Sequence, residues 1–283
     1  MSHDRLLRGL VLGRGARLLW VEASESAKQI AKGHGLREGA ARLAGELVVA
    51  NLLMSAYIKG DERVSLQLQA TRPACSFHGE VDAEGHVRAR LTPDRLTGAA
   101  TLDGMMLVIK HDARQELYRG VTPVEGQSVD AALNEHLRRS DQVAAMVRID
   151  AALREDGSLK HARGILLERL PDAAGHGSVS QARFDEVVGS LRDAPFEEVQ
   201  LGVAFAKIGG EPLELLELRE VVAQCRCSQT KVEATLYGLG VDALGEMLHE
   251  DGGAEVTCHF CGTAYQVSAG RLGELIAEHG YQA

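Results

Sequence analysis

The sequence lacks several features that would assign a function directly. Only 4% of its 283 residues are aromatic, so its core must be mainly aliphatic. It has no Gly-rich phosphate loop and no Gly-x-Ser-x-Gly elbow, and its eleven histidines are scattered. These absences leave no basis for a nucleotide-binding loop or a serine triad. These motifs therefore give no reason to predict an enzyme.

Long apolar runs and a leader segment are also missing. The longest helical apolar stretch, 43–58, contains Glu46, Asn51 and Ser55, which makes it too short and too polar for a membrane span. The opening residues, Met-Ser-His-Asp-Arg-Leu-Leu, do not combine a basic region with an apolar run, so a signal peptide is not expected. The default is a cytoplasmic protein with reduced thiols and no membrane partner.

Basic residues are scarce in the last third of the chain. Residues 175–283 hold 7 Lys and Arg against 17 Asp and Glu, whereas residues 1–174 hold 24 against 23. An acidic surface repels phosphate backbones, so no nucleic-acid partner is expected there. Keeping the protein soluble is another use of the same charge.

The first part of the chain has the pattern of an antiparallel α+β domain. Apolar residues at 10–12 and 16–23 favour strands, and residues 64–69 alternate between apolar and polar side chains. Helical spacing predicts helices over 24–31, 38–57 and 128–137, with Ser24 or Ser26 capping the first and Ser128 the third. Three hairpins are expected where apolar stretches flank short polar turns: 77–81 with 87–91, 105–110 with 116–121, and 147–153 with 159–167. The pattern predicts an N-terminal, antiparallel β-rich domain with packed helices over residues 1–174.

A different pattern follows over residues 175–224. Small polar residues mark a boundary near 171–180, and Gly189, Pro195, Gly202 and the 209–212 stretch then divide an apolar, helical pattern into short pieces. Isolated helices of such length are marginal in water. We therefore expect a helical linker that depends on what it packs against. It is either permanently docked or metastable and releasable.

Four of the five cysteines lie in the last 59 residues, as Cys225-x-Cys227 and Cys258-x-x-Cys261. The second pair, followed by Gly262, can turn back onto one metal. The first pair can reach the same metal if its backbone is extended, because alternate side chains of a strand point the same way. The spacing predicts one Zn²⁺ in a closed, tetrahedral four-thiolate site. This site would belong to a small C-terminal zinc-binding domain over residues 225–283.

Other readings of these cysteines remain open. An iron–sulfur cluster also takes four thiolates, and His249 or His259 could compete as a ligand. Two structural disulfides are unfavourable in a reducing compartment. A domain this small has a thin core and depends on its metal to fold, so oxidation that removed the thiolates would also remove folding energy. Cys75 stands apart, and we expect a small, partly buried residue whose role stays open.

The cysteine pattern resembles that of the redox-regulated 33-kilodalton heat-shock chaperones, in which Cys-x-Cys is followed after about thirty residues by Cys-His-Phe-Cys-Gly. The similarity extends to residues 59–69, 118–126, 244–247 and 255–257 and to Tyr265, and it covers essentially the whole chain. It implies an ATP-independent holdase whose reduced, zinc-bound form is inactive. Oxidation would form the disulfides Cys225–Cys227 and Cys258–Cys261, release zinc, and unfold the C-terminal domain and the linker.

The resemblance also implies partners. The exposed apolar surface would bind unfolding client proteins during oxidative stress, the activated form would be a homodimer, and clients would pass to ATP-dependent foldase chaperones. Candidate client contacts are the exposed parts of the first-domain sheet and the apolar residues of the linker, namely Phe184, Val188, Leu191, Phe196, Phe205, Leu215 and Leu216.

The alternative is a zinc-ribbon module that binds a protein or a nucleic acid. Its basic, aromatic surface is not apparent, because the last 59 residues contain three basic residues against eight acidic ones. A thiol–disulfide oxidoreductase would need a Cys-x-x-Cys at a helix N-terminus within a βαβ unit, and the sequence shows no such context.

Overall fold

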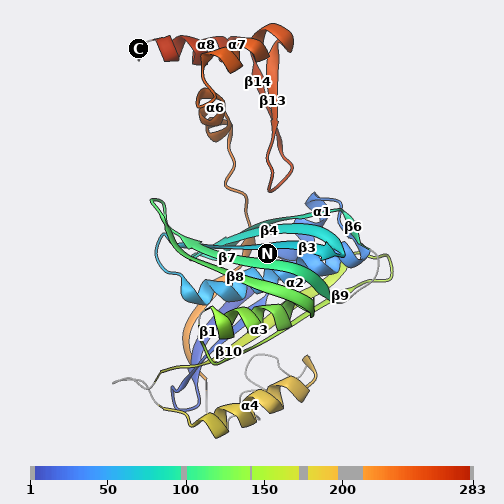
Figure 1. Ribbon diagram of the computed structural model, residues 1–283, viewed down its shortest axis with the longest axis vertical. Helices are drawn as coiled ribbons and strands as arrows, with labels where there is room; N and C mark the ends of the chain where they lie inside the picture. The colour runs from blue at the N-terminus through green and yellow to red at the C-terminus, as the bar shows by residue number, and fades with distance from the viewer. Residues whose placement is uncertain (1–3, 97–100, 141, 172–177, 197–212, 281–283) are drawn as a thin grey trace. The chain divides into compact units, whose positions relative to one another are not determined.

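The chain folds into two compact units, which are described separately below. A computed structural model describes residues 4–96, 101–140, 142–171, 178–196 and 213–280. Unit 1 is Met1–Gln224 and unit 2 is Cys225–Ala283. Both contain helices and antiparallel strands, so the α+β class predicted from the sequence is confirmed (Figure 1). No helix in the described ranges is long and apolar enough to cross a membrane.

Unit 1 contains two β-sheets. Sheet 1 has the order β11-β1-β2-β10-β9 and is antiparallel throughout. Its strands are β1 (Arg5–Val11), β2 (Ala16–Glu22), β9 (Ala145–Leu153), β10 (Leu159–Arg169) and β11 (Glu214–Glu220). Sheet 2 has the order β12-β5-β4-β3-β7-β8, and only the β12–β5 pair is parallel. Its strands are β3 (Arg63–Arg72), β4 (Ala74–Asp82), β5 (His86–Thr92), β7 (Leu102–His111), β8 (Glu116–Gln127) and β12 (Val222–Ala223).

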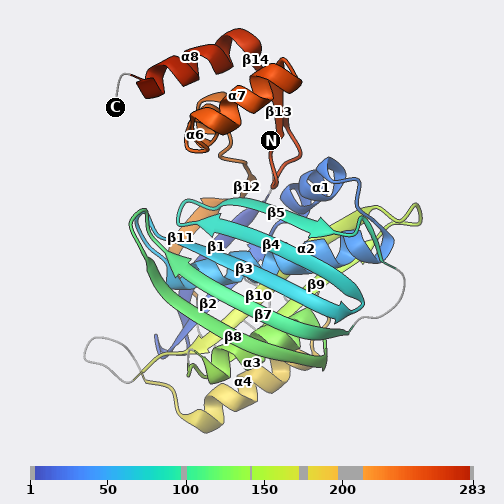
Figure 2. The ribbon, with the colours of Figure 1, turned by 45° about the horizontal axis from the view of Figure 1, so that its top comes forward.

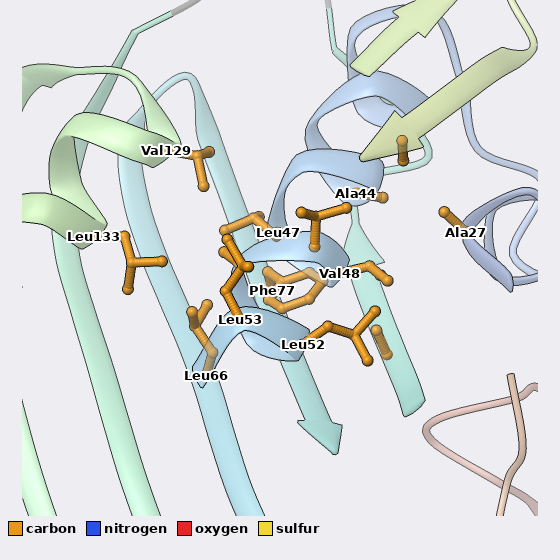
Figure 3. Close-up of a cluster of buried hydrophobic side chains, with 14 of the residues drawn as sticks. Ala27, Ala44, Leu47, Val48, Leu52, Leu53, Leu66, Phe77, Val129 and Leu133 are labelled. Atoms are coloured by element: carbon orange, nitrogen blue, oxygen red, sulfur yellow. The ribbon is translucent and has the colours of Figure 1, made fainter. Parts of the chain in front are cut away.

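Helix α2 (Glu38–Met54) lies between the two sheets (Figure 2). Of its 17 residues, 13 are buried, because the helix packs on strands of both sheets. Figure 3 shows Leu47 and Leu53 of this helix among Leu66 and Phe77 from sheet 2 and Leu133 from α3. The remaining elements are α1 (Ser24–Gly33), the 3₁₀ turn Ser55–Tyr57, the two-residue β6 (Arg95–Leu96) and α3 (Val129–Arg139).

Local patterns predicted most of these elements correctly. The three hairpins are confirmed by the registers of β4–β5, β7–β8 and β9–β10. Ser128 caps α3, accepting a hydrogen bond from the Ala131 N–H at 3.4 Å. The predicted cap of α1 by Ser24 or Ser26 is wrong. The carboxylate of Asp4 instead accepts the N–H groups of Glu25 and Ser26 at 3.0 and 2.5 Å, since the helix N-terminus attracts negative charge.

Helix α4 (Gln181–Asp193) is docked on the face of sheet 1 opposite α2 (Figure 1). Its apolar residues pack with Trp20 and Ile165 of the sheet. Phe196 follows the helix, with its ring centroid 5.6 Å from that of Trp20. The guanidinium of Arg148 donates to the carbonyl of Ala194 at 2.9 Å. The first helical part of the expected linker is therefore packed into unit 1.

The second part of the expected linker is not helical. Residues 214–220 form β11, which pairs with β1, and Val222–Ala223 form β12. The prediction of helix here is wrong because pairing with the free edge of β1 overrides local preference. Glu217 and Glu220 of β11 lie opposite Arg8 and Arg5 of β1 in the register. Residues 197–212 lie outside the described ranges.

Unit 2 is small and has a thin core. It consists of α6 (Gln229–Tyr237), α7 (Val241–Glu250), the hairpin β13 (Gly253–Thr257) and β14 (Ala264–Ser268), and α8 (Ala269–Gly280). Its buried apolar residues in the described part are Val232, Leu236, Leu244, Val267, Leu272 and Leu275. A core of this size supports a single small unit only weakly.

Candidate metal centre

The turn between β13 and β14 presents two of the four cysteines. The Gly262 N–H donates to the carbonyl of Cys258 at 2.9 Å, and the Cys258 N–H donates to the carbonyl of Thr263 at 2.8 Å. Gly262 has a φ of 72°, a left-handed conformation that glycine adopts without steric cost. This tight turn brings Cys258 and Cys261 to the same side.

The other two cysteines lie in the non-helical segment that precedes α6. Ser228 ends this segment with extended backbone and caps α6 by accepting the Lys231 N–H at 3.3 Å. The ammonium of Lys231 donates to the carbonyl of Arg226 at 2.6 Å, which fixes the peptide between the two cysteines. The sequence predicted that Cys225 and Cys227 could reach one metal only from an extended backbone, and the backbone here is not helical.

The four sulfur atoms gather at one point. Cys225 Sγ lies 3.6 Å from Cys258 Sγ, and Cys227 Sγ lies 3.4 Å from Cys261 Sγ. All four lie within 4.8 Å of one another, and all are free thiols. A tetrahedral zinc with Zn–S bonds of about 2.3 Å requires sulfur atoms roughly 3.8 Å apart. The four cysteines could therefore hold one metal ion, and no histidine of the described chain belongs to the cluster.

Electrostatics within the cluster oppose the ionisation of several thiols at once. Burial raises the pKa of Cys225 to about 12, and burial also raises the pKa of Cys227. For Cys261, burial acts in the same direction, but hydrogen bonds with Thr263 and the neighbouring sulfurs outweigh it and lower the pKa to about 6. The Cys261 thiolate therefore forms easily, whereas the thiolates of Cys225 and Cys227 need a cation among the sulfurs.

Tyr265 contributes a hydrogen bond to the cysteine cluster that was not predicted from the sequence. Its hydroxyl donates to Cys227 Sγ at 2.9 Å, and this hydrogen bond raises the pKa of Tyr265 to about 12. Outer hydrogen bonds of this kind orient metal ligands and tune their basicity. Tyr265 lies 38 residues beyond Cys227, so only the folded hairpin shows the contact.

The candidate client contacts fall into different environments. Phe184, Val188, Leu191 and Phe196 are buried against sheet 1. Leu215 and Leu216 on β11 are 53% and 50% exposed, and Phe205 lies outside the described residues. On sheet 2, the outward residues Met105, Leu117 and Val121 of β7 and β8 are also exposed.

Comparison with known proteins agrees with this architecture. The family model described as Hsp33 protein matches residues 4–268. The 33 kDa chaperonin of Staphylococcus haemolyticus is 25% identical over 300 residues, covering 98% of this chain and 99% of the relative. The 33 kDa chaperonin of Citrifermentans bemidjiense is 27% identical over 293 residues, covering 97% of each. The crystal structure of the 33 kDa chaperonin from Thermotoga maritima superposes with a TM-score of 0.86 at 19% identity, covering 99% of this chain and all of that one.

These matches define the class of protein as a chaperone and not an enzyme, and its four clustered cysteines could hold a metal ion. The chain belongs to the Hsp33 family. As a member of a chaperone family it acts on client proteins.

Proposed function

We propose that the protein is a redox-regulated, ATP-independent holdase. Its reduced form carries one Zn²⁺ on Cys225, Cys227, Cys258 and Cys261 and is inactive. The observation that carries this proposal is the set of four free thiols within 4.8 Å of one another in a unit with only six buried apolar residues in its described core. Bound zinc supplies folding energy of about 10–16 kcal/mol in small domains, whereas such a core alone supplies roughly 3–5 kcal/mol.

Oxidation removes the ligands. Each pair of thiolates would give two electrons to one peroxide molecule, which takes up two protons from the solvent. The products are one disulfide and two molecules of water, and the zinc ion loses its ligands. We assign the pairs as Cys225–Cys227 and Cys258–Cys261. Two crosswise sulfur pairs lie 3.6 and 3.4 Å apart, but all four sulfurs lie within 4.8 Å of one another, so these distances do not decide the pairing. Once unit 2 loosens, cysteines that are two or three residues apart stay close together, whereas cysteines more than thirty residues apart can separate.

Release then extends from unit 2 into residues 175–224, which we take as the linker between a core domain, 1–174, and the switch domain, 225–283. Strand β11 is the weakly held part. Its leucines are half exposed, and its side chains are fixed by ion pairs such as Arg8–Glu217 at 3.0 Å and Arg14–Glu214 at 3.4 Å. Pairs this exposed contribute only about 0.2–1 kcal/mol each.

Helix α4 is held more firmly. Four of its apolar side chains are buried: Phe184, Val187, Val188 and Leu191. At roughly 1.5–3 kcal/mol each, they stabilise the docked helix by about 6–12 kcal/mol at most. Oxidation alone is therefore not enough to release α4, and heat is required in addition. Once free, α4 and the sheet face beneath it would offer apolar surface to unfolding clients.

We further propose a cytoplasmic protein that forms a homodimer when activated and passes its clients to ATP-dependent foldase chaperones. The exposed edge of sheet 1 left by β11 would favour association. A reducing compartment is needed to keep the four thiols ready for zinc.

The proposal is tested with reduced, zinc-loaded, full-length protein and a thermolabile client enzyme. Peroxide together with mild heat should release one zinc per chain, detected with a chelating dye, and should switch on suppression of light scattering without ATP. Peptide mapping should find the two adjacent disulfides. Equal protection by the reduced form, or zinc that stays bound after oxidation, would refute the switch, and crosswise disulfides would refute the pairing.

A further inference from the structure

A pocket of unit 1 is lined by residues that belong to none of the surfaces discussed so far. Its volume is about 310 Å³. Three segments build it: the C-terminal half of α1 with Lys28 and Lys32, the loop before α2 with Leu36 and Arg37, and the β9–β10 turn with Arg154 and Leu159. It therefore combines segments that are far apart in the sequence.

Backbone hydrogen bonds fix the walls of this pocket. The Leu36 N–H donates to the carbonyl of Ala31 at 2.8 Å, which folds the loop back onto α1. The Glu38 N–H donates to the carbonyl of Gly157 at 2.8 Å, which joins the start of α2 to the β9–β10 turn. Leu36 and Leu159 are 4% and 2% exposed and form an apolar floor. The cavity is thus part of the folded structure and not a gap between loose side chains.

The charge of the lining is one-sided. Lys28, Lys32, Arg37 and Arg154 contribute four cations, and no carboxylate is among the lining residues of the described chain. Residues 1–174 as a whole are nearly balanced, with 24 basic against 23 acidic side chains, so the pocket concentrates charge of one sign. Lys28 pairs with Glu25 at 2.7 Å, while Lys32 and Arg37 make no salt bridge within the described ranges.

Two nearby features reduce the positive charge of the pocket but do not neutralise it. Asp156 accepts hydrogen bonds from the N–H and hydroxyl of Ser158, at 2.9 and 2.6 Å, within the β9–β10 turn. The C-terminus of α1 also carries partial negative charge, which accounts for lysines on that helix. It does not account for Arg37 and Arg154, which come from other segments.

We propose that this pocket binds a small phosphorylated molecule. Guanidinium groups pair with phosphate through two parallel hydrogen bonds, and lysines add point charges. A volume of about 310 Å³ is at the lower limit of small-molecule sites and is too small to enclose a nucleic acid or a folded partner. The apolar floor suits the carbon skeleton of an organic phosphate better than free phosphate.

The test measures binding by calorimetry on reduced, zinc-loaded, full-length protein at low ionic strength. Fructose 1,6-bisphosphate is the probe, and inorganic phosphate and a deca-glutamate peptide are the comparison ligands. The double variant Lys32→Gln/Arg37→Gln should weaken binding of the bisphosphate by at least about tenfold. The control Arg114→Gln/Arg192→Gln removes the same charge from exposed positions elsewhere in unit 1 and should change it by less than about twofold.

Each outcome decides the matter. Saturable binding of the bisphosphate that only the pocket variant weakens supports the proposal, and tighter binding of the bisphosphate than of inorganic phosphate supports an organic ligand. No binding by wild-type protein up to about 10 mM probe would overturn it, as would equal weakening by both variants. Tighter binding of deca-glutamate would identify an acidic-peptide site instead. Circular dichroism of both variants confirms that they fold.

Discussion

Changing Cys258 to serine should unfold unit 2 and leave the core of unit 1 folded. The substitution removes one of four sulfurs that lie within 4.8 Å of one another, leaving three thiolates for the metal. Zinc contributes about 10–16 kcal/mol to the folding of a small thiolate domain, and the six-residue core of unit 2 contributes roughly 3–5 kcal/mol. Even a partial loss of zinc affinity therefore exceeds what the core can compensate, and unit 2 should unfold while the core of unit 1 around α2 stays folded.

Hydrogen exchange followed by mass spectrometry reports both units in one experiment. In the variant, amides of residues 225–280 should lose most of their protection, those of α2 should keep theirs, and the zinc content should fall well below one per chain. Cys75→Ala is the matched control, because Cys75 is buried in the core of unit 1 and should leave zinc content unchanged. Stoichiometric zinc in Cys258→Ser with unaltered protection, or simultaneous unfolding of unit 1, would refute the reasoning.

Three further changes have defined outcomes. Tyr265→Phe removes the hydrogen bond to Cys227 and should lower zinc affinity about 10–100-fold in chelator competition; an unchanged affinity would remove Tyr265 from the site. Glu217→Gln removes the ion pair with Arg8 and should speed amide exchange in β11 by about twofold to fivefold. Because 1 M salt screens the ion pair, it should speed exchange in the wild type to the same extent, and the two proteins should then exchange at equal rates. Burial raises the pKa of Glu46 from 4.5 to about 7, so the folded protein keeps this side chain protonated where the unfolded chain does not. The free energy of unfolding therefore falls as pH rises through that range. Wild type should therefore lose on the order of 1–3 kcal/mol relative to Glu46→Gln between pH 5 and pH 8 in urea titrations, and parallel pH profiles would contradict this.

Features that depend on neighbouring residues were predictable from the sequence. The hairpins, α2 and the Ser128 cap follow from periodicity and turn residues within short windows. The four clustered cysteines also follow, because two close pairs in a thin domain have few other uses.

Features that depend on distant partners were not predictable. The cap of α1 comes from Asp4, 21 residues before the amide it accepts. Residues 214–220 become a strand only because the edge of β1 is available. The hydrogen bond from Tyr265 requires the folded hairpin to bring it to Cys227. In each case the observed structure depends on a contact with a residue far away in the sequence, which local sequence patterns do not reveal.

The pairing of β1 with β11 has a consequence for the order in which the protein is made. On the ribosome, β1 emerges long before its outer partner β11, which spans Glu214–Glu220. The hairpins of sheet 2, between residues 63 and 127, need only nearby residues and can form early. Sheet 1 is complete only after β11 has been made, and the edge of β1 stays open until then. In the switch that we propose, the last strand added to sheet 1 during synthesis would also be the first to leave it under stress.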